Sequence, residues 1–503
     1  MNNKTTAERR KTKQQGQVFT PRAIVESMLG YCGYEGAGIL RKHVMDNSCG
    51  DGAFLRVMLR RYIEAARAAG LTPEAIKHDL ETYIHGIDND EAAYEACRAH
   101  LSDIAAAYGI RDVAWDLRCE SALTLRQYDG QMDFVVGNPP YVRVHNLKAT
   151  YDDVKAYKFA EGGMTDLYLA FFELGFRMLS PEGRLCYITP SSWLGSVAAD
   201  TMRRYILQHR NLVALIDLGH YQAFDGATAY TMISLFEKHH GQPQFDYYTY
   251  DGVAHERTFV ARLSLAEAYI DTCFYLSDAA HLGLLREIKT APARKYVSVK
   301  NGFATLADGV FIGSHIPPSP ITIRVLKGST GQWYNGLFPY DKAGKPLSES
   351  EVFASAAVKA HLLSAKSALL KGKAEHPGWY LYGRTQALAD VYRPKLSVNT
   401  LIRSERDFKL TRLRAGEGIY SGLYVITDFD IDFGMIARII ASEDFVAYVK
   451  LLKKYKSGGY YTFSSKDLAQ YLNYFLTYKT GQTYALRQSV LGRHPDLFQG
   501  VYQ

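Results

Sequence analysis

The sequence predicts a doubly wound α/β domain with a mostly parallel, Rossmann-like sheet, followed by an irregular α+β domain. Two observations lead to this prediction. Between residues 39 and 238, short apolar runs typical of strands alternate with longer runs whose apolar residues recur at helical spacing. After about residue 245 this alternation is lost, and aromatic residues, glycine and proline are interspersed instead. Strand–helix–strand alternation indicates a parallel sheet with helices on both faces, which binds ligands at the carboxyl ends of its strands.

The expected elements follow one another in a regular order. The first strand is HVMD, and the helix after it, AFLRVMLRRYIEAARAAG, stops at Gly70. The remaining expected elements are TYIHGID, EAAYEACRAHLSDIAAAYG, VAWDLRCE, DFVVGN, DLYLAFFELGFRMLS, RLCYITP, a helix over about 197–209, LVALIDLG and TMISLFEK.

The chain divides into four expected segments. In order, they are a basic arm (1–22), the α/β domain (23–245), a connection (246–285) and the α+β domain (286–503). Helical patterns return inside the last segment at 351–371 and 435–455. A length of 503 residues with 47% hydrophobic residues is enough for two or three packed domains.

The composition argues against a membrane protein and against a metal- or disulfide-stabilised one. The N-terminus has no apolar signal region, and no stretch approaches the roughly 18 apolar residues that a membrane span requires. The six cysteines (32, 49, 97, 119, 186 and 273) include no CxxC pair and no histidine cluster, which favours reduced, buried thiols. We therefore expect a cytoplasmic protein with no membrane partner and no metal.

The charge is distributed unevenly along the chain. Residues 1–280 carry 29 basic and 35 acidic side chains, whereas residues 281–503 carry 30 basic and 17 acidic ones. The C-terminal part is therefore a basic module. Such a module suits a polyanionic partner, because lysine and arginine that neutralise phosphates release counterions. A solvated basic surface without a partner is the alternative interpretation.

Acidic residues and glycines follow the first three strands. The first strand runs into DNSCGDG (46–52), a turn whose glycines allow close approach of a ligand to the backbone. The second strand ends at Asp88, where a ribose diol would lie in a nucleoside-binding sheet, and Glu120 follows the third. No GK[ST] follows the glycines and no G-x-G-x-x-G is present, so neither a phosphate loop nor a dinucleotide fingerprint is predicted. A tight βα connection and helix-capping aspartates are the structural alternatives.

The tetrapeptide Asn138-Pro139-Pro140-Tyr141 directly follows the fourth strand. Prolines cannot extend a strand ladder, so they stiffen the loop at the carboxyl edge of the sheet. Asn138 and the Pro139 carbonyl then offer two hydrogen-bond acceptors beside the Tyr141 ring. This arrangement suits a planar group with an exocyclic amine, whereas the alternative is a structural turn.

Together with G16-Q-V-F-T-P21 upstream, these segments resemble the S-adenosylmethionine-dependent DNA N6-adenine methyltransferases of the gamma arrangement, the TaqI-type enzymes of restriction–modification systems. The resemblance extends over nearly the whole chain. FDGATAY at 224–230 resembles the segment whose aromatic residue contacts the flipped base, and WYLYGR at 379–384 and GGYYTFSSKDL at 458–468 resemble parts of a target-recognition domain. The resemblance implies a methyltransferase sheet followed by a target-recognition domain at 286–503.

The resemblance also implies roles for individual residues. Asn138, Pro139, Pro140 and Tyr141 would be catalytic, and Tyr141 and Phe224 would contact the target base. The implied cofactor-binding residues are Thr20, Pro21, Asp46, Ser48, Gly50, Gly52, Asp88, Asn89, Glu120, Ser121 and Asn138. The family often has aspartate where this chain has Glu120, and PACGSG is common where it has NSCGDG.

The implied reaction is transfer of a methyl group from S-adenosylmethionine, without a metal, to N6 of an adenine flipped out of double-stranded DNA. The enzyme would modify DNA in a type II restriction–modification system of a bacterium or archaeon, near the nucleoid. A cognate endonuclease could exist without forming a stable complex. The candidate DNA-binding residues of the basic module are Arg384, Arg403, Arg406, Lys409, Arg412 and Arg414, although a solvated strand pair would show the same pattern.

Several other functions share parts of this pattern. NPPY also resembles the motif of protein-glutamine and some RNA methyltransferases, and the upstream element also occurs in modification subunits of multi-subunit type I systems. A fused nuclease and a catalytically silent DNA-binding protein are further alternatives. LREIKT, within residues 284–290, lacks a supporting acid and is interpreted as a helix end. The long basic module, WYLYGR and the intact Asn138 and Tyr141 favour a methyltransferase with its own recognition domain.

Overall fold

The computed structural model describes residues 20–144, 151–162, 165–224, 229–371, 374 and 376–479. The chain forms two compact units, Met1–Leu284 and Leu285–Gln503. Most of the expected basic arm, residues 16–19 of GQVFTP and residues 225–228 of FDGATAY lie outside the described residues. Among the described helices, none is long and apolar enough to cross a membrane.

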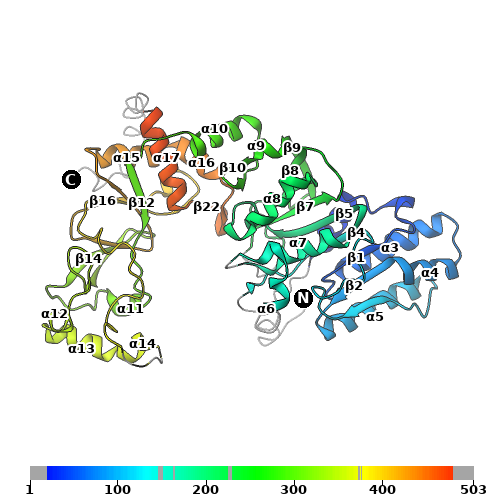
Figure 1. Cartoon of the computed structure of the whole chain (residues 1–503), viewed down its shortest axis with the longest axis horizontal. Coiled ribbons are helices and arrows are strands. Elements are labelled where there is room, and N and C mark those ends of the chain that lie inside the picture. The colour runs from blue at the N-terminus through cyan, green and yellow to red at the C-terminus, as the bar shows by residue number, and fades with distance from the viewer. Residues whose placement is uncertain are drawn as a thin grey trace. The chain divides into compact units, whose positions relative to one another are not determined.

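A nine-stranded sheet is the centre of the first unit (Figure 1). In spatial order its strands are β3 (Asp116–Cys119), β2 (Ile84–Asp88), β1 (Val44–Asp46), β4 (Met132–Gly137), β5 (Leu179–Pro190), β7 (Thr231–Glu237), β6 (Leu212–Asp217), β8 (Gln244–Asp251) and β9 (Glu256–Ser264). Only β7 and β9 run antiparallel to their neighbours. The mostly parallel sheet confirms the predicted α/β class.

Helices cover both faces of this sheet. One face carries α2 (Arg22–Tyr31), α3 (Ala53–Ala68), α4 (Pro73–Tyr83) and α5 (Glu91–Ala107), which share a hydrophobic cluster with Val136, Ile188 and Ile233. The other face carries α7 (Leu167–Met178), whose Phe172 and Phe176 rings lie 5.8 and 5.0 Å from the ring of Phe236. Successive strand residues point to opposite faces, so Ile233 and Phe236 of β7 pack against helices on opposite sides of the sheet. Near α7, Tyr205 of α8 (Asp200–His209) stacks on Phe176.

Helices α4 and α2 are among the elements of this unit that were not expected from the sequence. Helix α4 begins after Thr72, whose hydroxyl accepts a hydrogen bond from the Ala75 N–H, and Pro73 occupies the first helical position. These are strong start signals. Helix α2 buries Ile24, Val25, Met28 and Leu29, and it places Pro21 at its N-terminus.

The expected connection over 246–285 is wrong for its first part. Strand β8 pairs with β6, and β9 pairs with β8, so residues 244–264 extend the large sheet rather than leaving it. The physical reason lies in the edge position of β9. Its residues are mostly exposed and polar, which resembles a loop in sequence. A short hairpin of β10 (Tyr269–Ile270) and β11 (Cys273–Phe274) follows, and α10 (Ala279–Thr290) contains the boundary between the units.

The described part of the second unit contains three small sheets. Their strand orders are β12 (Val297–Asn301)–β20 (Leu423–Thr427)–β16 (Lys395–Val398)–β18 (Leu410–Leu413), β13 (Ile312–Gly313)–β15 (Gln332–Leu337)–β14 (Thr322–Lys327)–β19 (Gly418–Tyr420), and β17 (Leu401–Ile402)–β22 (Tyr460–Thr462)–β21 (Tyr455–Lys456). The described helices of this unit, besides the end of α10, are α11 (Asp308–Phe311), α12 (Glu349–Val352), α13 (Ala356–Ser364), α14 (Lys366–Leu370), α15 (Phe433–Ile440), α16 (Glu443–Leu451) and α17 (Ser465–Tyr478). The mixture of sheets and helices agrees with an α+β unit.

An ion triad joins three segments of the second unit, and two of its three side chains are buried. Asp467 lies in the first turn of α17, and its carboxylate contacts Lys289 Nζ at 2.7 Å and Lys454 Nζ at 2.5 Å. Lys289 also donates to Gln470 Oε1 at 3.0 Å. The side chains of Asp467 and Lys289 are 5% and 2% exposed, so water contributes little to the solvation of either charge.

All six cysteines are free thiols. Four of them are buried, as the sequence predicts, but Cys119 at the end of β3 is exposed and Cys273 is half-buried.

Candidate active site

The candidate site lies where the strand order of the large sheet reverses. Strand β1 pairs with β2 on one side and with β4 on the other, so the chain moves in opposite directions from β1. Such a switch point leaves a crevice at the carboxyl ends of the strands. Asp46 ends β1, Asp88 ends β2 and Asn138 directly follows β4. The residues that the sequence singled out therefore meet at one edge of the sheet.

The turn after β1 is fixed by hydrogen bonds to these two carboxylates. The Ser48 N–H donates to Asp46 Oδ1 at 3.1 Å, and the Gly50 N–H donates to Asp88 Oδ2 at 2.9 Å. Gly50 has a φ of 53°, and no atom lies within 4 Å of the position that a Cβ on it would occupy. The backbone at Gly50 is therefore open to a ligand.

Burial raises the pKa of both carboxyl groups. Asp46 is 1% exposed, and its pKa rises from 3.8 to about 8 because burial disfavours the charged form, with a further contribution from the nearby Asp88 charge. Burial also raises the pKa of Asp88, although the Asp90 and Gly50 N–H groups oppose the shift. Two carboxyl groups whose charged forms are disfavoured, both at the carboxyl edge of the sheet, favour binding of a cation, because a cation would stabilise their ionised forms.

Asp46→Asn should make the protein more stable at pH 8. The folded protein retains a proton on Asp46 that the unfolded chain releases between about pH 4 and 8, so the unfolding free energy falls as the pH rises through that window. The asparagine oxygen preserves the bond from the Ser48 N–H and removes the charge. The melting temperature of the variant should exceed that of the wild type at pH 8, by about 2–4 °C per kcal/mol, and the difference should shrink at pH 5.

Asp246→Asn is the matched control for that experiment. Arg262 hydrogen-bonds to Asp246 and lowers its pKa, so its charge stabilises the fold and the substitution should act in the opposite direction. An equal difference between Asp46→Asn and the wild type at pH 5 and pH 8 would contradict the assignment.

Gly52→Ala should destabilise the first unit by about 2 kcal/mol. Gly52 has a φ of 89°, which L-residues with a side chain rarely adopt, and a Cβ there would lie 2.8 Å from Cys97 Sγ. Urea denaturation should show a lower midpoint with an unchanged slope. Gly70→Ala, at a φ of 78° with open space around the Cβ position, isolates the backbone contribution. Equal losses in both variants would show that the Cys97 contact is unimportant.

Asn138 is held by the turn after β1 and by Thr20. Its Nδ2 donates to Thr20 Oγ1 at 3.1 Å, and its backbone carbonyl accepts from Ser48 Oγ at 3.4 Å. Gly137 permits this closeness, since a Cβ on it would lie 2.6 Å from Asp46 Oδ1. Pro139 is buried and Pro140 half-buried. The segment is thus a rigid shelf directly beside Asp46.

Tyr141 is anchored at both ends of its side chain. Its hydroxyl donates to the Ile188 carbonyl at 2.9 Å. Its ring makes edge-to-face contacts with the rings of Phe224 and Tyr168, at centroid distances of 6.1 and 6.4 Å. The family resemblance implies that Tyr141 and Phe224 both contact the target base. The structure brings the two rings together, but Phe224 is only 3% exposed and so presents little surface to a ligand in this conformation.

The remaining predicted cofactor residues lie around this edge. Glu120 and Asn89 are exposed, and Glu120 follows Cys119, which is the register partner of Asp88. Pro21 is exposed and Thr20 is buried. Ser121 is half-buried and lies in the connection between β3 and β4.

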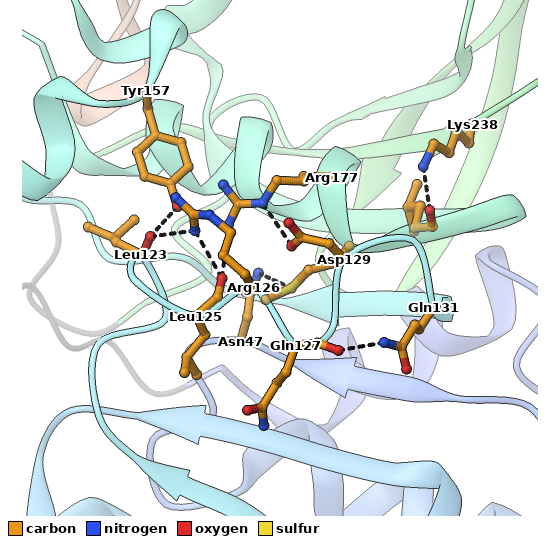
Figure 2. A network of polar contacts seen from close by, with 12 residues as sticks. Asn47, Leu123, Leu125, Arg126, Gln127, Asp129, Gln131, Tyr157, Arg177 and Lys238 are labelled. Atoms are coloured by element: carbon orange, nitrogen blue, oxygen red, sulfur yellow. Dashed lines mark hydrogen bonds and ion pairs between the residues drawn. The ribbon is translucent and has the colours of Figure 1, made fainter.

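That connection is held against helix α7 by an arginine (Figure 2). Arg177 Nε donates to Asp129 Oδ1 at 2.8 Å, and Arg177 Nη2 donates to the Leu125 carbonyl and the Tyr157 hydroxyl at 3.2 Å each. The Tyr157 hydroxyl in turn donates to the Leu123 carbonyl. The segment that leads from Ser121 to β4 is therefore fixed in position.

Sequence reasoning missed Asn47 as a part of this edge. Asn47 is 1% exposed, its Nδ2 donates to the Tyr187 hydroxyl at 2.7 Å, and the Tyr187 hydroxyl lies 3.0 Å from Asn47 Oδ1. This pair ties the end of β1 to β5. The available signal was an asparagine inside a segment that is otherwise buried, because a buried amide requires partners.

The basic candidates of the second unit are all exposed, but they are distributed over several elements. Arg403 stacks on the Tyr460 ring, with its guanidinium carbon 4.4 Å from the ring centroid. Arg412 belongs to β18, which is in another sheet than Tyr460, and its guanidinium carbon lies 5.8 Å from the Phe433 ring centroid. Lys409 lies beside the turn at Gly331. The dense cluster of the sequence is therefore divided in space. Arg384 belongs to the segment before β16 and Arg414 to the turn between β18 and β19.

Residues 75–224 match the family model described as Eco57I restriction-modification methylase. This stretch contains Asp88, Glu120, the shelf at Asn138 and Phe224. The chain contains an Eco57I-type restriction-modification methylase domain.

This methylase domain is similar to curated type II methyltransferases. M.BstVI of Geobacillus stearothermophilus is 28% identical over 235 residues, which cover 44% of this chain and 42% of that protein. The restriction enzyme and methyltransferase RM.Eco57I of Escherichia coli is 25% identical over 285 residues, covering 46% of this chain and 28% of that protein. The chain thus spans less than half the length of these relatives.

Solved structures share the fold beyond the methylase domain. The type IIL restriction-modification enzyme MmeI, solved in complex with DNA, matches with a TM-score of 0.59 at 14% identity and covers 88% of this chain and 63% of its own. The type ISP enzyme LlaGI, solved as a nuclease-deletion mutant with a DNA substrate mimic, matches with a TM-score of 0.55 at 10% identity, covering 88% and 52%. At these identities the likeness concerns the fold alone.

Proposed function

We propose that the chain is a site-specific DNA methyltransferase that transfers a methyl group from S-adenosylmethionine to N6 of an adenine in duplex DNA, as the modification enzyme of a type II restriction–modification system. The observation that carries the proposal is the rigid acceptor shelf at Asn138 beside the buried Asp46, at the switch point of a methylase domain.

The residues around the turn after β1 fit S-adenosylmethionine. Buried Asp46 suits its cationic amino group, Asp88 suits the ribose hydroxyls, and the open backbone at Gly50 allows close approach. Thr20 and Pro21 would border the methionine end. Ser48, Gly52, Asn89, Glu120 and Ser121 would complete the pocket, with Glu120 opposite the cofactor adenine. When bound, this molecule supplies an electrophilic methyl group on a sulfonium.

Asn138 and the Pro139 carbonyl would activate the adenine amine. The N6 lone pair is delocalised into the ring, so the amine is a poor nucleophile. Two acceptors that hydrogen-bond to its protons disfavour the planar form and direct the lone pair outward. The hydrogen bonds to Thr20 and Ser48 hold this shelf in place before the substrate arrives.

The target adenine would have to leave the duplex to reach the shelf. Unstacking costs a few kcal/mol, which contacts with Tyr141 would partly offset. Because Phe224 is buried against Tyr141, its part in holding the base requires the two rings to separate. The second unit would act as target-recognition domain, with exposed lysines and arginines on phosphates and a few side chains on base edges. A cognate endonuclease would be a separate protein.

Transfer of tritium from labelled S-adenosylmethionine tests the proposal. The purified full chain is incubated with duplex DNA, with cellular RNA and with a protein extract in parallel. Label should appear in DNA only. Label confined to protein or RNA would replace the proposal with methylation of a planar amide or amine in those substrates.

A further inference from the structure

The sheet β17–β22–β21 of the second unit has one exposed face. Directly opposed residues in antiparallel strands point to the same face, and here Leu401 opposes Thr462 and Lys456 opposes Tyr460. Leu401 is 46% exposed and Lys456 is exposed, whereas Ile402 and Tyr455 of the opposite face are buried. The exposed face therefore combines a cation, an aromatic ring and an apolar side chain.

Arg403 extends this face and is held over the Tyr460 ring. Its guanidinium carbon lies 4.4 Å from the ring centroid, and its Cδ lies 3.9 Å from the Cβ position of Gly459. Arginine stacked on an aromatic face keeps its planar fork of N–H donors available at the edge.

The backbone under Arg403 is closed into a rigid loop. Asp407 Oδ2 accepts the N–H groups of Arg403 and Ser404 at 2.7 and 3.0 Å. Asn399 donates to the Leu401 and Asp407 carbonyls at 3.1 and 2.9 Å, and its Oδ1 accepts the Lys409 N–H at 2.7 Å. The Asp407 carboxylate is engaged by these N–H groups and lies 3.9 Å from Arg403 Nε, so it offsets the arginine charge only in part.

We propose that the exposed face of β17–β22–β21 contacts duplex DNA in the major groove, with Arg403, steadied by Tyr460, reading one guanine of the recognition sequence. This inference rests on the proposed function. Guanine presents two acceptors, N7 and O6, that match a fixed guanidinium fork, and such a bidentate pair gives base discrimination. Lys456, opposite Tyr460, is placed to meet a phosphate beside that base.

The test begins with the recognition sequence of the wild-type chain, found by sequencing methylated DNA from a host that expresses it. Binding of Arg403→Ala, Arg403→Lys and Tyr460→Leu is then measured on duplexes that carry each base at every guanine position. At one position, Arg403→Ala should lose at least about tenfold discrimination for guanine. Arg403→Lys should lose it equally, because lysine keeps the charge but not the fork. Tyr460→Leu should weaken it and Tyr460→Phe should preserve it.

Arg324→Ala is the matched control. Arg324 also stacks on an aromatic ring in this unit, 4.3 Å from the Trp333 centroid, but Glu417 compensates its charge at 3.4 Å. Its discrimination should equal that of the wild type. If Arg403→Ala weakens binding equally on all sequences and lowers the salt slope by about one, Arg403 contacts a phosphate and the inference is overturned. Equal effects of Arg324→Ala and Arg403→Ala would also overturn it.

Different results would refute the role of Arg403 and the proposed methyltransferase function. A wild-type chain that methylates DNA while all Arg403 variants retain its sequence preference would refute the inference and leave the proposed function intact. A wild-type chain that binds S-adenosylmethionine and methylates no DNA would refute the proposed function and the inference with it.

Discussion

Asn138→Ala is expected to lower the rate of methyl transfer at least about 10³-fold while leaving S-adenosylmethionine and DNA binding within about threefold of the wild type. The alanine removes the side-chain acceptor but leaves the Pro139 carbonyl and the backbone of the shelf. The lost interaction is one that strengthens only as the amine becomes nucleophilic, so the effect should fall on kcat rather than on KM. Single-turnover transfer from tritiated S-adenosylmethionine measures it directly.

Two comparisons make this result specific. The melting temperature should stay close to that of the wild type, because Asn138 is half-buried and the alanine keeps the backbone carbonyl that accepts from Ser48 Oγ. Thr20→Val, which removes the partner hydroxyl and keeps the volume, should reduce the rate far less. Residual activity of Asn138→Ala above a tenth of the wild type would contradict the role of the side chain.

Asp467→Ala is expected to destabilise the second unit by about 3–5 kcal/mol. The substitution removes the carboxylate partner of Lys289, whose side chain is only 2% exposed, so water can compensate the loss only in small part. Burial opposes ionisation of Asp467, but the charges of Lys289 and Lys454 dominate and lower its pKa, so the carboxylate is stabilising at neutral pH. Asp467→Ala also removes the capping box at the start of α17, in which Ser464 and Asp467 hydrogen-bond reciprocally.

Hydrogen exchange of amides in both units shows whether Asp467→Ala destabilises the second unit alone or the whole protein. Amides of α17 and β12 should lose protection, whereas those of β1 and β4 should not. Asp246→Asn removes an ion pair whose arginine is 64% exposed and should cost less than about 1 kcal/mol. Unchanged protection of α17 in Asp467→Ala would show that the triad contributes nothing to stability.

The fold class of the first unit and the strand-end residues of its candidate site could be predicted from the sequence. The alternation of buried strands and amphipathic helices is a local pattern. Asp46 and Asp88 end a strand and Asn138 directly follows one, so the parallel topology brings the three to one edge of the sheet without knowledge of distant contacts. The exposed edge strand β9 escaped notice because half-exposed edge strands have no continuous apolar run.

The rest depends on contacts between distant parts of the chain. The bonds between Thr20 and Asn138 and between Asn47 and Tyr187 join residues 118 and 140 positions apart. The parallel pairing of β14 with β19 and the placement of Tyr460 beside Arg403 are equally non-local. Local patterns do not specify register between such segments, so neither the small sheets of the second unit nor the division of its basic residues could be predicted.

The nature of the methylated base is the most direct test of the central claim. Duplex DNA from cells that express the wild-type chain, and from cells that express Asn138→Ala, is digested to nucleosides and analysed by mass spectrometry. N6-methyladenine should appear with the wild-type chain and be absent with the variant. Methylated cytosine in its place, or no methylated nucleoside from a chain that binds S-adenosylmethionine, would contradict the account.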